Sequence, residues 1–238
     1  EVAKFTFSDV SKKTIFKAYK KDGSLVKNGA TIAAVNGYAR DVLAAERVAL
    51  NFLSLLSGVS TATKNFADKV KGTKTKIMDT RKTTPNLREL EKYAVRVGGG
   101  FNHRLSLYGG VIVKDNHLRA GKYIVGTSLD EEKISGLIKS LRKKVSHKIE
   151  IEVETLPELK SVIKYRPDII MLDNFSLANL KKAVNFRNKY FPKIKLDASG
   201  GINLKNAKAV ARSGVDYISI GMITHSSYAI DFSLDING

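Results

Sequence analysis

From residue 76 to residue 220 the sequence alternates short apolar stretches with longer amphipathic ones, and this alternation constrains the possible folds most. The stretches that we expect to be strands are 76–78, 111–113, 149–153, 169–172, 194–196 and 217–220. The stretches between them that we expect to be helices are 87–97, 131–141, 157–165, 177–190 and 204–212. Strands connected through helices pair in parallel, so the pattern predicts an α/β fold, either a barrel or a doubly wound sheet.

The sequence before residue 76 has a different pattern and predicts a small α/β unit. Residues 14–19 and 31–35 alternate as half-buried strands do, and a turn with an Asp-Gly signal lies between them at 21–24. Residues 41–56 predict a helix whose apolar surface is wider than one stripe, which favours burial between layers. We expect Gly58 to end this helix and a second helix to cover 59–70.

The run from Ile77 to Pro85 changes within a few residues from an apolar strand to cations and hydroxyls. Pro85 ends any strand, and Asn86 followed by Glu89 predicts a helix N-cap with a capping-box pattern. Arg81 and Lys82 therefore lie at the carboxyl end of a strand, where α/β sheets and barrels bind ligands. An isolated Arg-Lys pair is usually a solvated loop, so the other strand ends decide its meaning.

Polar side chains follow every expected strand, and parallel pairing would gather them at one edge. Four cations at these positions, with Arg47 from outside, suit an acid with more than one carboxylate: Arg81, His103, Arg104 and Lys114. The carboxylates Glu152 and Asp173 suit Mg²⁺, although each could equally be a structural acid that balances the cations. The late glycines Gly200, Gly201 and Gly221 leave backbone N–H groups open to a phosphate, although a Gly-Gly pair can equally be a tight turn.

Composition limits the class of protein. The chain of 238 residues has a net charge of +18, which favours a nucleic acid or small anionic substrates as partners. Neither zinc-finger spacing nor an RNA-binding aromatic motif is present in the sequence. It contains no Cys, no uninterrupted apolar run near the roughly 18 residues of a membrane span and no visible signal peptide, which together predict a cytoplasmic protein.

Several motifs, in this order, strongly resemble the quinolinate phosphoribosyltransferase family. They are DTRKTTP from Asp79, EKYAVRVGGGFNHRLSLY from Glu91, VIVKDNH, IEVET, IIMLDN, ASGGI and DYISIGMITHS, and the likeness extends from about residue 29 to residue 236. The resemblance implies an incomplete seven-stranded (β/α) barrel over 58–225. It also implies a small α/β domain over 1–57 that a C-terminal tail, 226–238, completes with a strand at 230–234. Family members usually begin with further helical sequence, so we expect a segment before Glu1.

The resemblance also implies substrates and roles. Quinolinate and phosphoribosyl pyrophosphate would give nicotinate mononucleotide, pyrophosphate and CO₂. Arg81, His103, Arg104 and Lys114, with Arg47 from the other subunit of a homodimer, would orient the dicarboxylate. Lys82 and Mg²⁺ near Glu152 and Asp173 would stabilise the pyrophosphate and ribose, and these three residues are the catalytic candidates. The 5-phosphate would bind at Ser199, Gly200, Gly201, Gly221 and His225.

One position departs from the family, and two rival functions stay open. Gly109 stands where relatives commonly carry Asp before Gly110, which loosens the turn that leads to Lys114. A nicotinate phosphoribosyltransferase or the molybdenum-transport-associated relative would use a related fold, but a monocarboxylate needs fewer cations. A nucleic-acid-binding protein would explain the net charge but not the carboxylates at the strand ends. The sequence does not determine the order of substrate binding or an oligomer beyond a dimer.

Overall fold

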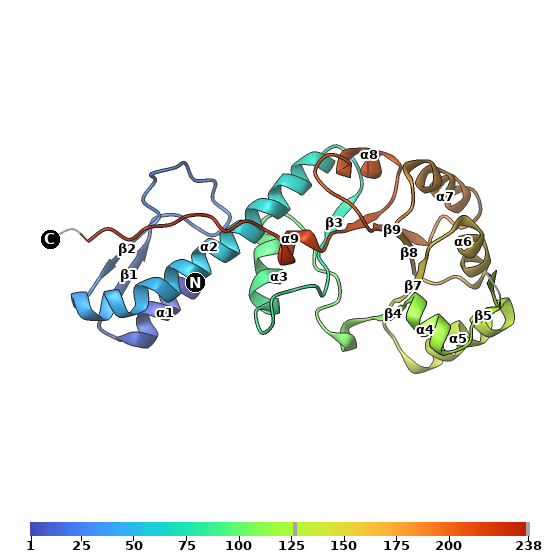
Figure 1. The fold of residues 1–238 in the computed structure, drawn as a ribbon, viewed down its shortest axis with the longest axis horizontal. Coiled ribbons are helices and arrows are strands. Elements are labelled where there is room, and N and C mark those ends of the chain that lie inside the picture. The colour runs from blue at the N-terminus through green and yellow to red at the C-terminus, as the bar shows by residue number, and fades with distance from the viewer. Residues whose placement is uncertain (126–127, 237–238) are drawn as a thin grey trace.

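The computed structural model describes residues 1–125 and 128–236, and Figure 1 shows that they form a small part and a larger part joined by one long helix. The small part contains α1 (Val2–Val10), an antiparallel pair β1 (Ile15–Ala18) and β2 (Ala33–Asn36), and the first half of α2 (Ala39–Val70). Its own apolar cluster joins Ala3 and Phe7 of α1 to Val42, Ala45 and Ala49 of α2.

The larger part is an incomplete α/β barrel. Six strands pair in parallel in the order β3-β10-β9-β8-β7-β4, with bounds β3 (Lys76–Met78), β4 (Val111–Val113), β7 (Ile149–Val153), β8 (Ile169–Asp173), β9 (Lys195–Ser199) and β10 (Tyr217–Ser219). Phe101 adds a seventh position as a single parallel bridge to Met78, beside β3. Within the described residues no ladder joins Phe101 to β4, so the barrel is open there.

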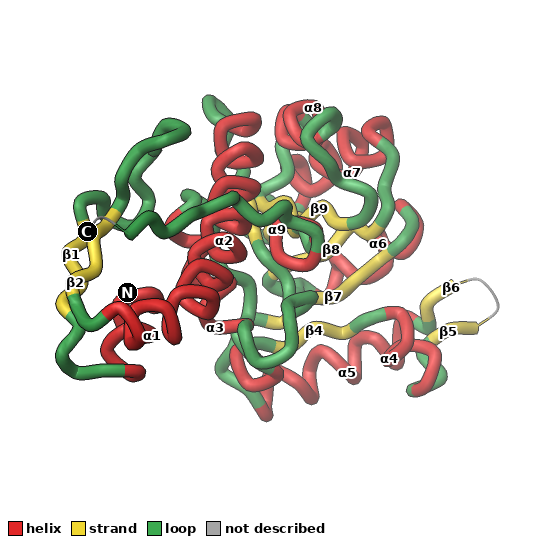
Figure 2. Tube along the Cα trace, turned by 60° about the vertical axis from the view of Figure 1, so that its left-hand side comes forward, coloured by secondary structure: helices red, strands yellow, loops and turns green. Residues whose placement is uncertain are grey.

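Helices connect the strands and cover the outside of the sheet. They are α3 (Arg88–Val97), α4 (Asp115–Ala120), α5 (Glu131–Lys144), α6 (Leu156–Val162), α7 (Leu177–Tyr190), α8 (Ala207–Arg212) and α9 (Met222–His225), with short 3₁₀ turns at Leu107–Gly109 and Ile163–Tyr165. A small hairpin of β5 (Ile124–Val125) and β6 (Ser128–Leu129) extends from the edge near α4 and α5 (Figure 2). The sequence thus predicted every strand of the sheet to within a few residues.

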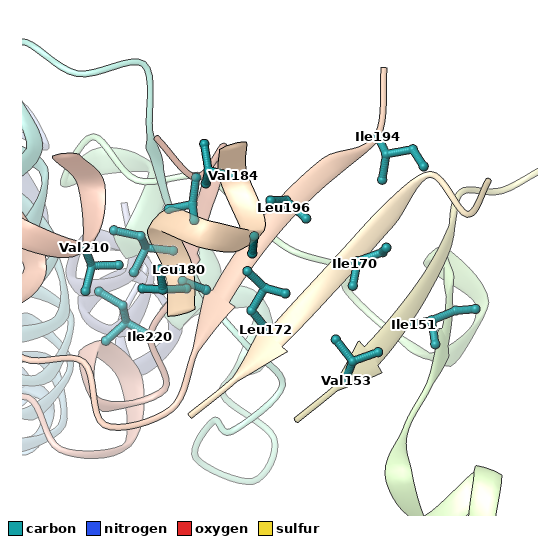
Figure 3. Close-up of a cluster of buried hydrophobic side chains, with 14 of the residues drawn as sticks. Ile151, Val153, Ile170, Leu172, Leu180, Val184, Ile194, Leu196, Val210 and Ile220 are labelled. Carbon is teal, nitrogen blue, oxygen red and sulfur yellow. The ribbon is translucent and has the colours of Figure 1, made fainter. Parts of the chain in front are cut away.

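The two faces of the sheet differ in chemistry because side chains alternate along a strand. On β7, Ile149, Ile151 and Val153 enter the apolar core, so Glu150 and Glu152 face the other way. The same alternation places Leu196 of β9 in the core and Asp197 on the opposite face. Figure 3 shows the outer apolar face, where strand side chains meet those of α7 and α8. The inner face of the barrel carries these acids among apolar residues such as Met78 and Ile169.

The expected break at Gly58 is absent, and α2 is one continuous helix from Ala39 to Val70. Gly58 instead lets the C-terminal segment cross the helix, because a Cβ there would lie 2.2 Å from the Tyr228 carbonyl oxygen. The Ile230 N–H donates to the Ser54 carbonyl beside this crossing. A glycine inside a helix costs about 1 kcal/mol relative to Ala, and here it marks a close backbone approach rather than a helix end.

Two further predictions of local structure are wrong. Asn86 has a positive φ of 63° and lies in a turn, whereas α3 begins at Arg88 with Leu87 as its N-cap. The turn is held differently, because Glu91 Oε2 accepts the Thr84 N–H at 3.1 Å. Residues 230–234 form no strand, although this segment does run back beside β1 and β2, where Leu234 packs on the small apolar cluster (Figures 1 and 2). Residues 237–238 of the predicted tail lie outside the described residues.

Among the helices of the described residues, α2 alone is long and apolar enough to cross a membrane by length and composition. A core helix of a globular protein meets the same criteria. In α2, polar residues interrupt the apolar sequence before it reaches the length of a membrane span. Here α2 packs against α1, α3 and α8 and contributes Val59, Phe66 and Val70 to the apolar core. This packing accounts for part of its apolar surface, while Leu43 and Val48 stay exposed.

Candidate active site

Parallel pairing brings the carboxyl ends of all six strands to one edge of the barrel, as the sequence predicted. Every site residue predicted from the sequence except Arg47 lies in the last residues of a strand, in the segment after one, or after the Phe101 bridge. Contacts between neighbouring segments show which of these residues lie together.

Arg81 and Arg104 form the cationic centre of this edge. The Arg104 Nη1–H donates to the Gly110 carbonyl at 2.9 Å, while its Nε is buried and has no partner. Burial and the nearby positive charge of Arg81 lower the pKa of Arg104. Two guanidinium groups that repel each other in a partly buried site favour a bound anion, which would relieve the repulsion.

A buried group of polar residues fixes the loops that carry these cations. Asp79 and Lys92 are fully buried and form an ion pair of 2.5 Å. Asp79 also accepts the His103 backbone N–H at 2.8 Å and the Asn102 side-chain amide at 2.6 Å. We call Asp79, Lys92 and Asn102 the clasp. It ties the end of β3, which leads to Arg81, to the segment that carries His103 and Arg104.

The two predicted metal ligands lie at the ends of the neighbouring strands β7 and β8. Glu152 is 8% exposed and forms an ion pair with Lys114 of the β4 end. Asp173 is half-buried, and its Oδ2 accepts the Asn174 side-chain amide at 2.8 Å. Lys114 therefore neutralises Glu152 in the free protein and is not directed only at a substrate.

The predicted phosphate-binding residues lie at the ends of β9 and β10. Thr224 Oγ1–H donates to the Lys82 carbonyl at 2.6 Å, and a Cβ on Gly221 would lie about as close to Lys82 Cδ (3.0 Å) as to His225 Nε2 (3.2 Å). Gly200 has a φ of +88°, and a Cβ there would meet Asn174 Oδ1 at 2.1 Å. Lys82 thus lies with Gly221 and His225, and the turn of Ser199, Gly200 and Gly201 lies against Asn174, next to Asp173.

Arg47 does not join this group within the chain. It is exposed on the half of α2 that packs against α1, between the cluster residues Ala45 and Ala49. The structure of one chain therefore leaves its predicted role in a neighbouring subunit as a prediction.

His103 is hydrogen-bonded to one acid, Glu150, and lies near a second, Asp197, and the sequence interpretation selected neither. Its Nδ1 accepts the Arg104 backbone N–H at 2.8 Å, so in the neutral ring Nε2 carries the proton and donates it to Glu150 Oε2 at 2.8 Å. Burial lowers the pKa of His103, but Glu150 and Asp197 outweigh it and the pKa is raised. Strict alternation in Ile149-Glu150-Ile151-Glu152-Val153 was the signal for Glu150, since Glu150 and Glu152 must share a face.

An open α/β barrel with clustered cations, paired carboxylates and glycine turns at its strand ends defines a class of enzyme that acts on small anionic substrates. The family described as "Quinolinate phosphoribosyl transferase, C-terminal domain" matches residues 59–235, and the corresponding N-terminal domain family matches residues 1–57. The chain belongs to the quinolinate phosphoribosyltransferase family.

Individual relatives agree with this assignment. The chain is 41% identical over 217 residues to the "Nicotinate-nucleotide pyrophosphorylase [carboxylating]" of Mycobacterium leprae, which covers 91% of this chain and 73% of that protein. A probable enzyme of the same name from Bacillus subtilis is 41% identical over 92% of this chain and 72% of its own length. The crystal structure of the nicotinate-nucleotide pyrophosphorylase from Ehrlichia chaffeensis superposes with a TM-score of 0.89 at 38% identity, over 99% of this chain and 82% of that chain.

Proposed function

We propose that this protein transfers the phosphoribosyl group of phosphoribosyl pyrophosphate to quinolinate and releases pyrophosphate and CO₂, giving nicotinate mononucleotide for NAD biosynthesis. Membership of the family supports the reaction, and the neighbouring Arg81 and Arg104 at the barrel mouth are the structural observation that carries it. A substrate with two carboxylates relieves the repulsion between these guanidinium groups, and each can bind a carboxylate with two hydrogen bonds.

The pyridine nitrogen of quinolinate is itself the nucleophile, so the protein's task is to position and to stabilise charge. Arg81, Arg104, His103 and Lys114 orient the two carboxylates toward the ribose. Lys82 faces the leaving pyrophosphate, and Glu152 and Asp173 favour the positive charge that develops on the ribose. The segment of Ser199, Gly200 and Gly201, with Gly221 and His225, holds the 5-phosphate.

The donor set at the ends of β7 and β8 fits a magnesium ion that is bound mainly through its substrate. Glu152 and Asp173 offer carboxylate oxygens, and Mg²⁺ usually takes one or two carboxylates together with substrate phosphates and water. Because Lys114 occupies Glu152 in the free protein, the protein ligands alone make a weak site. When bound, the ion would neutralise charge on the departing pyrophosphate.

The proposal includes a homodimer in which Arg47 enters the partner's site. The support is its position: it is exposed, and Leu43 and Val48 beside it are 52% and 50% exposed apolar side chains. An Arg surrounded by exposed apolar surface suits an interface. Analytical ultracentrifugation tests the homodimer. Steady-state kinetics of Arg47→Ala test the role of Arg47, since an unchanged KM for quinolinate would remove it.

The decisive experiment compares substrates. Purified protein with Mg²⁺ and phosphoribosyl pyrophosphate should convert quinolinate to nicotinate mononucleotide with one CO₂ released per product, and it should not use nicotinate. Turnover of nicotinate without CO₂ would instead assign a related phosphoribosyltransferase. Strong retention on duplex DNA at physiological salt with a steep salt dependence would revive the nucleic-acid alternative.

We also propose a cytoplasmic location. The relatives differ in this respect: a 39% identical relative from Arabidopsis thaliana, covering 92% of this chain and 64% of that protein, is named as chloroplastic. Fractionation of cells that express the protein tests the location.

A further inference from the structure

The reaction consumes a proton, and this inference rests on the proposed function. When CO₂ leaves, the bond between C2 of the pyridine ring and the carboxylate carbon breaks, and the electron pair stays on C2 beside the ring nitrogen. The product carries hydrogen at C2, so a C–H bond must form there. The residues assigned above are cations and metal ligands, and none of them has been given this task.

A cavity of about 290 Å³ lies inside the barrel. The segment that carries the site cations, His103 and Arg104, forms one wall, and Glu150 and Asp197 of the inner sheet face form another. Lys76 and Lys148, which are both exposed, line its other end, at the amino ends of β3 and β7. The cavity therefore has two candidate site residues, His103 and Arg104, in its wall and solvent-exposed lysines at its other end.

The walls of this cavity carry polar groups that lack partners. Among the described residues, five buried side-chain atoms have no hydrogen bond, and three of them belong to cavity residues: Arg104 Nε, Glu150 Oε1 and Asp197 Oδ1. Each of these three atoms is almost inaccessible to solvent, and ordered water commonly satisfies buried polar groups of this kind. The two acids and Arg104 thus line one cavity, together with apolar residues such as Met78 and Ile169.

Asp197 is the member of this group that holds a proton at neutral pH. It is 1% exposed, and two buried carboxylates so close together cannot both be ionised without a large cost. Glu150 accepts the His103 Nε2–H, whereas the side-chain hydrogen bond to Asp197 comes from the Ser219 hydroxyl. Burial and the charge of Glu150 raise the pKa of Asp197 to about 8, although Ser219 Oγ–H, which donates to Asp197 Oδ2 at 2.6 Å, lowers it.

The charged surroundings favour a proton over a metal ion in this cluster. One ligand atom from each of His103, Glu150 and Asp197 lies within 4.8 Å of the others, which a cation could use. Both ring nitrogens of His103 are already engaged, however, and the positive charges of Lys92 and Arg104 act on His103 and Glu150. A neutral carboxylic acid beside one carboxylate fits these surroundings better than a divalent cation.

We propose that Asp197 supplies, through water in this cavity, the proton that C2 of the pyridine ring takes up after CO₂ has left. The O–H bond of Asp197 breaks, a proton passes along the water to C2, and the electron pair left by CO₂ forms the new C–H bond. Asp197 becomes a carboxylate and recovers a proton from solvent through the end of the cavity at Lys76 and Lys148. Each turnover then takes one proton from solution and leaves the enzyme unchanged.

The first test is Asp197→Asn, which keeps the shape and removes the acid. We expect kcat to fall by roughly 10²–10⁴-fold, the usual contribution of a general acid, with the KM for quinolinate retained. Because phosphoribosyl transfer precedes proton uptake, rapid-quench experiments should show a burst of pyrophosphate followed by slow nicotinate mononucleotide formation. A merely structural role would slow both products together, so simultaneous appearance of the two overturns the proposal.

A second variant tests whether Asp197 is the acid that donates the proton, and it is informative even if Asp197→Asn does not fold. Ser219→Ala removes the hydrogen bond that lowers the pKa of Asp197, so the alkaline limb of kcat, expected near pH 8, should move to higher pH. An alkaline limb that stays in place in Ser219→Ala contradicts the proposal. The matched control is Asp216→Asn, a half-buried acid outside the cavity that pairs with Arg187, which should leave the limb and the product timing as in the wild type.

These outcomes separate the two hypotheses. If the wild-type protein does not convert quinolinate and phosphoribosyl pyrophosphate, the proposed function fails. If the wild type is active while Asp197→Asn retains its kcat and produces both products in step, only the role of Asp197 fails.

Discussion

The two faces of one sheet show how a single set of strands divides stability from chemistry. The outer face places Ile151, Leu172 and Leu196, all 0% exposed, against helices in a continuous apolar core. The inner face, one residue along each strand, carries Glu150 and Asp197 in the wall of a cavity and Glu152 nearer the carboxyl end of β7. Because alternation along a strand has a period of two, every inward polar residue is flanked by outward apolar ones that hold its position.

The interior of the barrel can hold acids and a cavity because the barrel is open on one side. Interiors of closed eight-stranded barrels are filled with layers of side chains. Here the seventh strand is a single bridge at Phe101, and the gap between Phe101 and β4 leaves room for a cavity. Changes on the outer face should therefore lower stability, and changes on the inner face should lower activity.

The largest loss of stability should come from a substitution in the clasp, which joins the end of β3 to the segment that carries His103 and Arg104. Lys92→Met leaves Asp79 charged and buried, which should cost about 3–5 kcal/mol in the free energy of unfolding. Urea denaturation measures it, and the double variant with Asp79→Asn should recover part of the loss. A cost as small as that of Lys64→Met, whose exposed i,i+4 pair with Asp68 is worth about 0.3–0.5 kcal/mol, would contradict this view of the clasp.

Truncating a side chain on the outer face should lower the free energy of unfolding almost as much, but it should leave the catalytic activity unchanged. Leu196→Ala removes a side chain that is 0% exposed and should cost about 2–5 kcal/mol. Since Leu196 faces away from the cavity, kcat per folded molecule should stay close to that of the wild type. A large fall in kcat with intact folding would show that the two faces are not independent.

A substitution in the site at the carboxyl ends of the strands should have the opposite effect: it should lower activity and leave stability almost unchanged. Arg81→Ala removes a charged hydrogen-bond partner of the dicarboxylate, and this should cost about 1.5–3 kcal/mol in kcat/KM, roughly 10–100-fold. The melting temperature should change little. The matched control is Arg142→Ala, which removes the ion pair between Arg142 of the outer helix α5 and Asp168. It should leave kcat/KM unchanged. Near-normal kcat/KM in Arg81→Ala would remove the assignment.

The smallest effect should be a pH dependence of stability on the outer side. Burial raises the pKa of Asp216, but hydrogen bonds from Lys195, the Leu196 N–H and Arg187 outweigh it and the pKa is lowered. A carboxyl whose folded pKa is lowered stabilises the fold above its unfolded pKa of about 3.8, and this contribution disappears as the pH falls through the folded value. Asp216→Asn should therefore lower the melting temperature at pH 7 and much less near pH 3; an equal loss at both would refute this.

The sequence sufficed for the features that local pattern controls. The bounds of β3, β4, β7 and α7 match their predictions, because apolar runs and amphipathic stretches report burial directly. The polar residues after the strands gather at one edge because parallel pairing follows from the helical connections. The roles of the individual site residues stay predictions.

Features that depend on distant segments could not be predicted. Gly58 has the local signature of a helix end, and only the crossing by Tyr228 explains it. Asn86 suits an N-cap and a left-handed turn equally well, and the bond from Thr84 to Glu91 favours the turn. The importance of Asp197 arises from Glu150 and His103, which reach it from other strands and loops.

The crossing of residues 228–230 over the middle of α2 has a consequence for how the molecule assembles. The Leu234 side chain completes a cluster whose other members all come from the first 53 residues, so the small part cannot finish packing until almost the whole sequence has been synthesised. Such a contact must overcome a large loop-closure entropy and should form late in folding. Until the segment that carries Leu234 has docked, the apolar cluster of the small part thus stays incompletely covered.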